Sequence, residues 1–227
     1  MTALKLGVRT ALPLESARGL VQTLCAVVLG CALTAWLERV ASPSHAVDRA
    51  LVRDAFGLWL PLAAYAAAER IGKKGRLELV IAALPRYGLS RRASLAGAVL
   101  ALGGVLAIVG ACCGAISVVV AHEDGSSALL SDLVASTWIG ALGGVSYAVW
   151  LGFASGFGRR GRRGTFLILD LIFGSSSRFW ALPFPRAHLR NLLGGTPLVG
   201  LSQAASVGLL AVLIGVVFAL TLARVPD

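Results

Sequence analysis

Long apolar stretches alternate with short polar segments along this chain. A helix that crosses a membrane needs about 20 largely apolar residues. Four stretches meet this requirement, and they cover residues 19–37, 95–121, 133–157 and 198–223. The pattern therefore predicts an all-α polytopic membrane protein.

Two further apolar stretches are weaker candidates for crossings. Residues 55–68 are short and contain Pro61, so this crossing is expected to begin upstream, near Val47. Residues 165–174 supply about 15 Å of helix at 1.5 Å per residue, about half of the hydrocarbon thickness. We therefore predict six transmembrane helices, of which the fifth is interrupted.

Composition agrees with a membrane protein. Only 14% of the 227 residues are charged, whereas soluble domains carry roughly 25%. The net charge of +10 does not favour nucleic-acid binding, because the basic residues cluster in particular loops. The four cysteines form no C-x-x-C motif and are expected to be small hydrophobic residues within the membrane.

The distribution of Lys and Arg predicts the orientation. With six crossings, fifteen basic residues fall on one side of the membrane and six on the other. Both termini are therefore expected in the cytoplasm, with the protein in a bacterial-type inner membrane. The fifteen are Lys5, Arg9, Arg18, Arg70, Lys73, Lys74, Arg76, Arg86, Arg91, Arg92, Arg159, Arg160, Arg162, Arg163 and Arg224, and the six are Arg39, Arg49, Arg53, Arg178, Arg186 and Arg190.

Three segments outside the predicted crossings have their own patterns. Residues 1–18 mix apolar and basic positions, which is typical of an interfacial helix, although a frayed tail is the alternative. Residues 174–197 contain aromatic residues, prolines and a Gly-Gly-Thr-Pro turn, which predicts a re-entrant or outer-facing cap. Residues 77–84 form a short apolar block on the basic side, interrupted only by Glu78.

This short block is too apolar for open water and too short for a crossing. Eight residues of helix cover about 12 Å, and Gly75 and Pro85 bracket the block as helix boundaries would. Because apolar residues nearly surround the helix, it needs an apolar cleft. The cleft belongs either to a cytoplasmic partner or to this chain's own helices, and the pattern alone leaves both open.

The segment from Glu69 to Leu102, ERIGKKGRLELVIAALPRYGLSRRASLAGAVLAL, resembles the connection between the second and third spans in type-2 (ABC-2) ABC exporter permeases. In that family a Glu ends the second span, and a Gly-x-Leu-Glu helix, a Pro break and a Ser-Arg-Arg step follow. The matching residues here are Glu69, Gly75, Leu77, Glu78, Leu79, Pro85, Ser90, Arg91, Arg92 and Gly97. Arg76, which follows Gly75, is counted with Glu69, Gly75, Leu77, Glu78, Leu79, Pro85, Arg91 and Arg92 as a residue expected to couple to the ATPase.

The resemblance implies that residues 76–84 form the coupling helix, which docks in a groove of a separate ATPase subunit. It also implies that residues 1–227 form one permease domain, paired with a second copy or a paralogue in the lipid bilayer. ATP and Mg²⁺ would bind the ATPase, because this chain has no G-x-x-x-x-G-K-[ST] motif and so is no ATPase itself. The rival interpretations are a non-transporting membrane anchor for a cytoplasmic complex and a haem- or metal-handling protein.

A few polar residues are candidates for chemistry. Asp170 lies inside an apolar run, where a carboxylate costs about 2.5 to 3.5 kcal/mol at the bilayer centre. It is expected either to line the translocation path or to accept hydrogen bonds where the fifth span breaks. His45, His122 and His188 are expected in three outer loops, without ligand-like spacing and without a metal.

Three G-x-x-x-G motifs predict close helix packing. They pair Gly110 with Gly114, Gly140 with Gly144, and Gly152 with Gly156. Packing within the chain and a seam between two copies are both compatible with the motifs.

Overall fold

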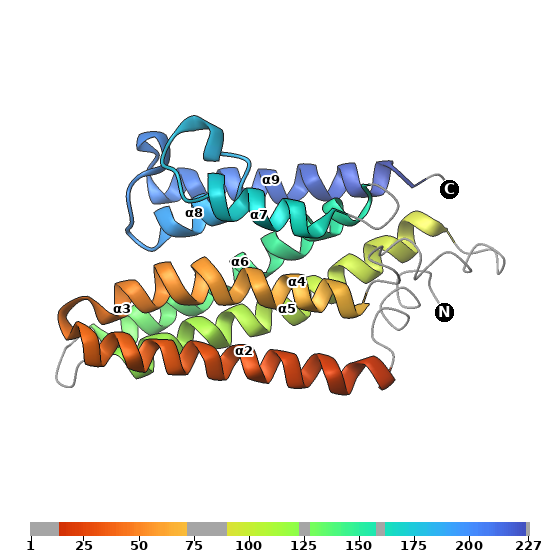
Figure 1. The fold of residues 1–227 in the computed structure, drawn as a ribbon. Helices are drawn as coiled ribbons and strands as arrows, with labels where there is room; N and C mark the ends of the chain where they lie inside the picture. Colours follow the sequence, from red (N-terminus) through yellow and green to blue (C-terminus); the bar gives the residue numbers. More distant parts are fainter. Residues whose placement is uncertain (1–13, 72–89, 123–127, 158–161, 226–227) are drawn as a thin grey trace.

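The computed structural model describes residues 14–71, 90–122, 128–157 and 162–225 (Figure 1). These residues form helices joined by turns, and no β-strand occurs among them. Four of their helices are long and apolar enough to cross a membrane. They are α2 (Leu14–Ala41), α5 (Arg91–Ala121), α6 (Leu129–Ser155) and α9 (Gln203–Ala223). The all-α prediction is confirmed, and these four helices support a membrane protein.

The second predicted crossing is one helical run. It consists of α3 (Ala46–Arg49), the π-helical segment η2 (Ala50–Trp59) and α4 (Leu60–Ile71), preceded by the 3₁₀ turn η1 (Pro43–His45). The backbone stays right-handed helical at both junctions. A π-helix widens the turn just before Pro61, where the proline ring would clash with a regular α-helical turn. The helical run thus begins upstream of residue 55, at Ala46, close to the expected start near Val47.

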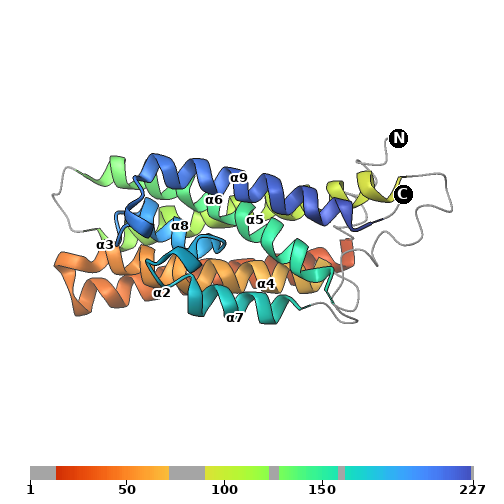
Figure 2. The same cartoon turned by 90° about the horizontal axis from the view of Figure 1, so that it is seen from above.

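The region of the predicted fifth crossing is built from short helices. The helix α7 (Arg163–Phe173) has 11 residues, which span about 16 Å. After it come η5 (Phe179–Ala181), α8 (Pro185–Leu192) and η6 (Leu198–Gly200). Figure 2 shows α7 alongside α4, and α8 packs against α9. Neither α7 nor α8 is long enough to cross a membrane by itself.

Several helix boundaries differ from the predicted ones. The last long helix begins at Gln203 rather than at residue 198, because Ser202 caps it by accepting a hydrogen bond from the Ala205 N–H at 3.2 Å. Likewise, Ser90 caps α5, so the third predicted crossing begins at Arg91. The backbone of residues 14–18, assigned above to an interfacial helix, already belongs to α2, and residues 1–13 lie outside the described part.

The long helices share two common ends. One end of the molecule holds the first residues of α2, α5 and α7 and the last residues of α4, α6 and α9 (Figures 1 and 2). We call it the basic end, because its described side chains include seven arginines and one carboxylate, Glu69. The arginines are Arg18, Arg70, Arg91, Arg92, Arg162, Arg163 and Arg224.

The opposite end of the molecule is mixed in charge. Its described residues include six arginines and four carboxylates. The charge asymmetry expected from the sequence is therefore present in three dimensions. The residues are Arg39, Arg49, Arg53, Arg178, Arg186, Arg190, Glu38, Asp48, Asp54 and Asp132.

Helices α5 and α6 form the tightest pair in the fold. A Cβ atom placed on Gly140 would overlap the backbone carbonyl of Gly110, and one on Gly144 would overlap the carbonyl of Leu106. A Cβ on Gly114 would lie 2.5 Å from the carbonyl oxygen of Ser136. Two of the three G-x-x-x-G motifs therefore serve packing within the chain, where small residues let helix backbones approach.

Candidate functional site

The predicted coupling residues fall partly outside the described structure. Glu69, Arg91 and Arg92 are described, at the end of α4 and in the first turn of α5. Gly75, Arg76, Leu77, Glu78, Leu79 and Pro85, together with the predicted helix over residues 76–84, lie outside the described residues. The structure thus places the two anchors of this connection, both at the basic end (Figure 1).

Glu69 forms an ion pair with a buried arginine of α7. Oε1 of Glu69 lies 2.9 Å from Nη2 of Arg163, whose side chain is only 1% exposed. Nη1 of Arg163 donates a hydrogen bond to the backbone carbonyl of Ala68. The Nη2 and Nε groups are not aligned with any described acceptor, so the pair is held by charge rather than by a directed hydrogen bond. The end of α4 is thereby tied to the start of α7.

A second connection ties the start of α5 to the end of α9. Arg92 donates from Nε to the backbone carbonyl of Val225 at 2.9 Å. The neighbouring Arg224 places its guanidinium 4.1 Å from the ring centre of Phe153 and 3.8 Å from that of Phe157. Such cation–π contacts contribute about 0.5–2 kcal/mol each. Both ends of the connection between α4 and α5 are therefore fastened to other helices.

Asp170 is fully buried and has two hydrogen-bond partners from its own chain. The Tyr147 hydroxyl, on α6, donates to Oδ2 at 2.7 Å, and the backbone N–H of Arg186 donates to Oδ1 at 3.2 Å. Both Asp170 and Tyr147 are 0% exposed. Hydrogen bonds of this kind offset the cost of burying a carboxylate. The geometry gives Asp170 a structural role, joining α6, α7 and α8.

The bond to Arg186 also completes the start of α8. This helix begins with Pro185, which has no N–H, and Phe184 at the N-cap position makes no side-chain cap. The Arg186 N–H is therefore an early donor without an intrahelical partner, and Asp170 supplies the acceptor. A carboxylate at this place also interacts favourably with the positive end of the helix dipole.

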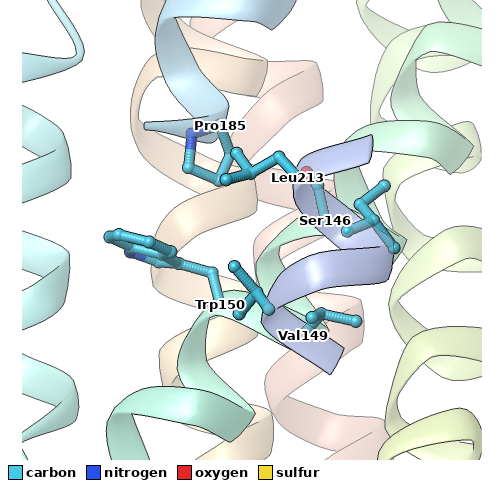
Figure 3. A pocket seen from close by; sticks show the side chains of 7 residues that line it. Ser146, Val149, Trp150, Pro185 and Leu213 are labelled. Atoms are coloured by element: carbon cyan, nitrogen blue, oxygen red, sulfur yellow. The ribbon is translucent and has the colours of Figure 1, made fainter. Parts of the chain in front are cut away.

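A small cavity lies between α6, α9 and the start of α8 (Figure 3). Its lining is almost entirely apolar and includes Val149, Trp150, Pro185 and Leu213. Its volume is about 10 Å³, which is about the minimum for one water molecule. In this conformation the cavity is too small for a substrate, and Asp170 is not among its lining residues.

The structure corrects the prediction for one histidine. His188 is 1% exposed and lies on α8, where its Nε2 is 2.8 Å from the carbonyl oxygen of Leu182. It is therefore not a solvent-facing loop residue. His45 is exposed, at the end of η1. No group of three His, Cys, Asp or Glu residues suited to a metal occurs among the described residues.

Sequence reasoning missed three residues of these sites. Arg163 was counted only as a loop cation, yet it is the largest fully buried side chain in the described part. Tyr147 and Arg186 were not connected with Asp170. One signal was available, because a buried carboxylate needs donors, and Tyr147 is a polar residue within a predicted crossing.

No family model matches the chain, and no curated protein or solved structure matches it. The assignment of a function therefore depends on the residues and the geometry described above.

Proposed function

We propose that this chain is the membrane-spanning permease subunit of an ATP-driven ABC exporter. In this proposal a separate cytoplasmic ATPase binds the segment between α4 and α5 and hydrolyses ATP. The observation that carries the proposal is the residue pattern from Glu69 to Leu102 together with the place of its anchors. Glu69, Arg91 and Arg92 all lie at the basic end, the end expected to face the cytoplasm.

The contacts of the two anchors support a coupling role. A force on the segment after α4 acts on Glu69, and the ion pair between Glu69 and Arg163 transmits this force to α7. A force on the segment before α5 acts on Arg92, and the hydrogen bond from Arg92 to the Val225 carbonyl transmits this force to the end of α9. The helix α7 in turn packs against the short helix α8. Force applied at the connection between α4 and α5 therefore reaches α7 and the end of α9.

The finer architecture belongs to the same proposal. The run from Ala46 to Ile71 is the second crossing, and α7 with the segments up to η6 is the interrupted fifth, which gives six crossings. Both termini face the cytoplasm of a bacterial-type cell, and two copies, or this chain and a paralogue, form the transporter. Residues 174–197 form the outer cap.

Co-purification tests the proposal. We expect the tagged chain, solubilised from the membranes of its own host, to retain an ATPase that contains G-x-x-x-x-G-K-[ST]. A variant with Glu78→Arg should lose that ATPase while remaining folded. Recovery of the folded chain with no ATPase under any solubilisation condition would favour the membrane anchor. A haem absorbance band in the purified protein would instead favour the haem-handling interpretation.

A further inference from the structure

A cavity of about 210 Å³ lies between η2, α8 and the residues just after α7. Three arginines line it, Arg53, Arg186 and Arg190, together with Ser175 and four apolar residues. No carboxylate is among the lining residues. The side chains that line the cavity therefore carry positive charge and no negative charge, and the cavity belongs to the end opposite the basic end.

The charges of the three arginines are compensated to different degrees. Arg53 has carboxylates nearby, since its Nη1 lies 3.6 Å from Oε1 of Glu38 and its Nε lies 4.0 Å from Oδ1 of Asp54. Its side chain is also 74% exposed, so water screens its charge. Arg186 is attracted by Asp170, which lies beside its backbone. Arg190 has no carboxylate within ion-pair distance among the described residues.

Arg190 is the residue with unmet hydrogen-bonding capacity. Its Nη1 donates to the backbone carbonyl of Ser175, whereas its buried Nε and Nη2 have no acceptor in the described part of the chain. Buried donors without acceptors are uncommon in native proteins, because each has lost its hydrogen bonds to water and gained none in return. A bound acceptor would satisfy these two donors of Arg190.

Arg186 adds a second guanidinium. Its one hydrogen bond to a described residue uses the backbone N–H, and its guanidinium makes none to the part of the chain that the structure describes. Gly57 allows the close approach of this side chain to η2, since a Cβ on Gly57 would lie 3.1 Å from Nη2 of Arg186. Arg186 and Arg190 are adjacent enough to repel each other. Two like charges held together around an open space favour a shared anion.

We propose that this cavity binds an oxyanion, a phosphate group held by Arg186 and Arg190. Planar guanidinium groups bind phosphate oxygens in pairs of parallel hydrogen bonds, which is why Arg is favoured at such sites. A volume of about 210 Å³ is many times the ~10–15 Å³ that one water molecule needs, so it is large enough for one phosphate group. The phosphate comes either from the headgroup of an anionic lipid or from a free solute.

Binding of inorganic phosphate to the purified full-length chain in neutral detergent tests this proposal. We expect phosphate to raise the midpoint of thermal unfolding, because a ligand that binds only the folded state stabilises it, and chloride at equal ionic strength to raise it much less. Arg186→Gln and Arg190→Gln should each weaken phosphate binding at least tenfold. Arg178→Gln is the matched control, because Arg178 lies 5.0 Å from the Trp180 ring and does not line the cavity.

A comparison of two membranes distinguishes the sources of the phosphate group. If the ligand is a lipid, the wild-type protein should have a higher midpoint of thermal unfolding in nanodiscs that contain phosphatidylglycerol than in nanodiscs of phosphatidylcholine alone. Arg186→Gln should remove this difference. If free phosphate gives the same shift in both membranes, a solute is the ligand.

Equal effects of phosphate and chloride, or equal phosphate affinity in wild type and both cavity variants, would overturn the proposal. Arg186→Gln keeps the test valid if Arg190→Gln fails to fold, because the Arg186 guanidinium makes no described hydrogen bond. The readout does not involve an ATPase, so the result is independent of the proposed transport function.

Discussion

Gly140→Ala is expected to destabilise the fold by about 3 kcal/mol, at the upper end of the ~1–3 kcal/mol typical of overpacking. The added Cβ would overlap the backbone carbonyl of Gly110 across the α5–α6 interface. Backbone atoms cannot rotate away as a flexible side chain does, so the two helices must separate. Gly140→Leu should abolish the folded protein. The measurement is the free energy of unfolding in detergent micelles, with circular dichroism as the signal that reports unfolding.

Gly104→Ala is the matched control for this prediction. Gly104 lies on α5 as well, but a Cβ there would meet no atom within 4 Å. Alanine favours a helix over glycine by about 0.8–1.0 kcal/mol, so this variant should be as stable as wild type or slightly more stable. Equal losses in both variants would show that α5 and α6 do not pack through these glycines.

Asp170→Leu should cost about 3 kcal/mol of stability. The change removes the acceptor for the Tyr147 hydroxyl and for the Arg186 N–H, and each buried donor left without a partner costs about 1–3 kcal/mol. The double variant Asp170→Leu/Tyr147→Phe should recover part of this loss, because the Tyr147 donor is then absent as well. The measurement is a double-mutant cycle of unfolding free energies. Additive losses would show that the two side chains do not interact.

Asp170→Asn separates the structural role from a transport role. Asparagine keeps one oxygen acceptor at nearly the same size, so the protein should assemble. If Asp170 lines a translocation path, transport falls although assembly is normal. Transport at the wild-type rate would remove Asp170 from the path and leave only its role between α6, α7 and α8.

The sequence predicts much of this fold, because each crossing needs a long apolar run. All four long helices were expected, and so was a start of the second helical run near Val47, one residue from the observed start at Ala46. The boundaries were less accurate, since they depend on single caps. Ser202 and Ser90 set the starts of α9 and α5 through hydrogen bonds of their side chains, and hydropathy does not report such bonds.

The polar contacts inside the fold were much harder to predict. Asp170 was recognised as a buried carboxylate, but its partners lie 23 and 16 residues away along the chain. The same holds for Arg163, which is 95 residues from the Ala68 carbonyl that it contacts. A sequence shows which residues need partners, and only the arrangement of helices shows which partners they meet.

The proposed coupling to ATP is tested most directly by the rate of ATP hydrolysis in the purified complex of this chain with its ATPase. The account predicts that Glu78→Arg lowers this rate at least tenfold, because the charge change lies in the segment expected to contact the ATPase. Glu123→Arg makes the same charge change in a segment expected on the opposite side of the membrane, and it should leave the rate unchanged. A wild-type rate with Glu78→Arg would contradict the account.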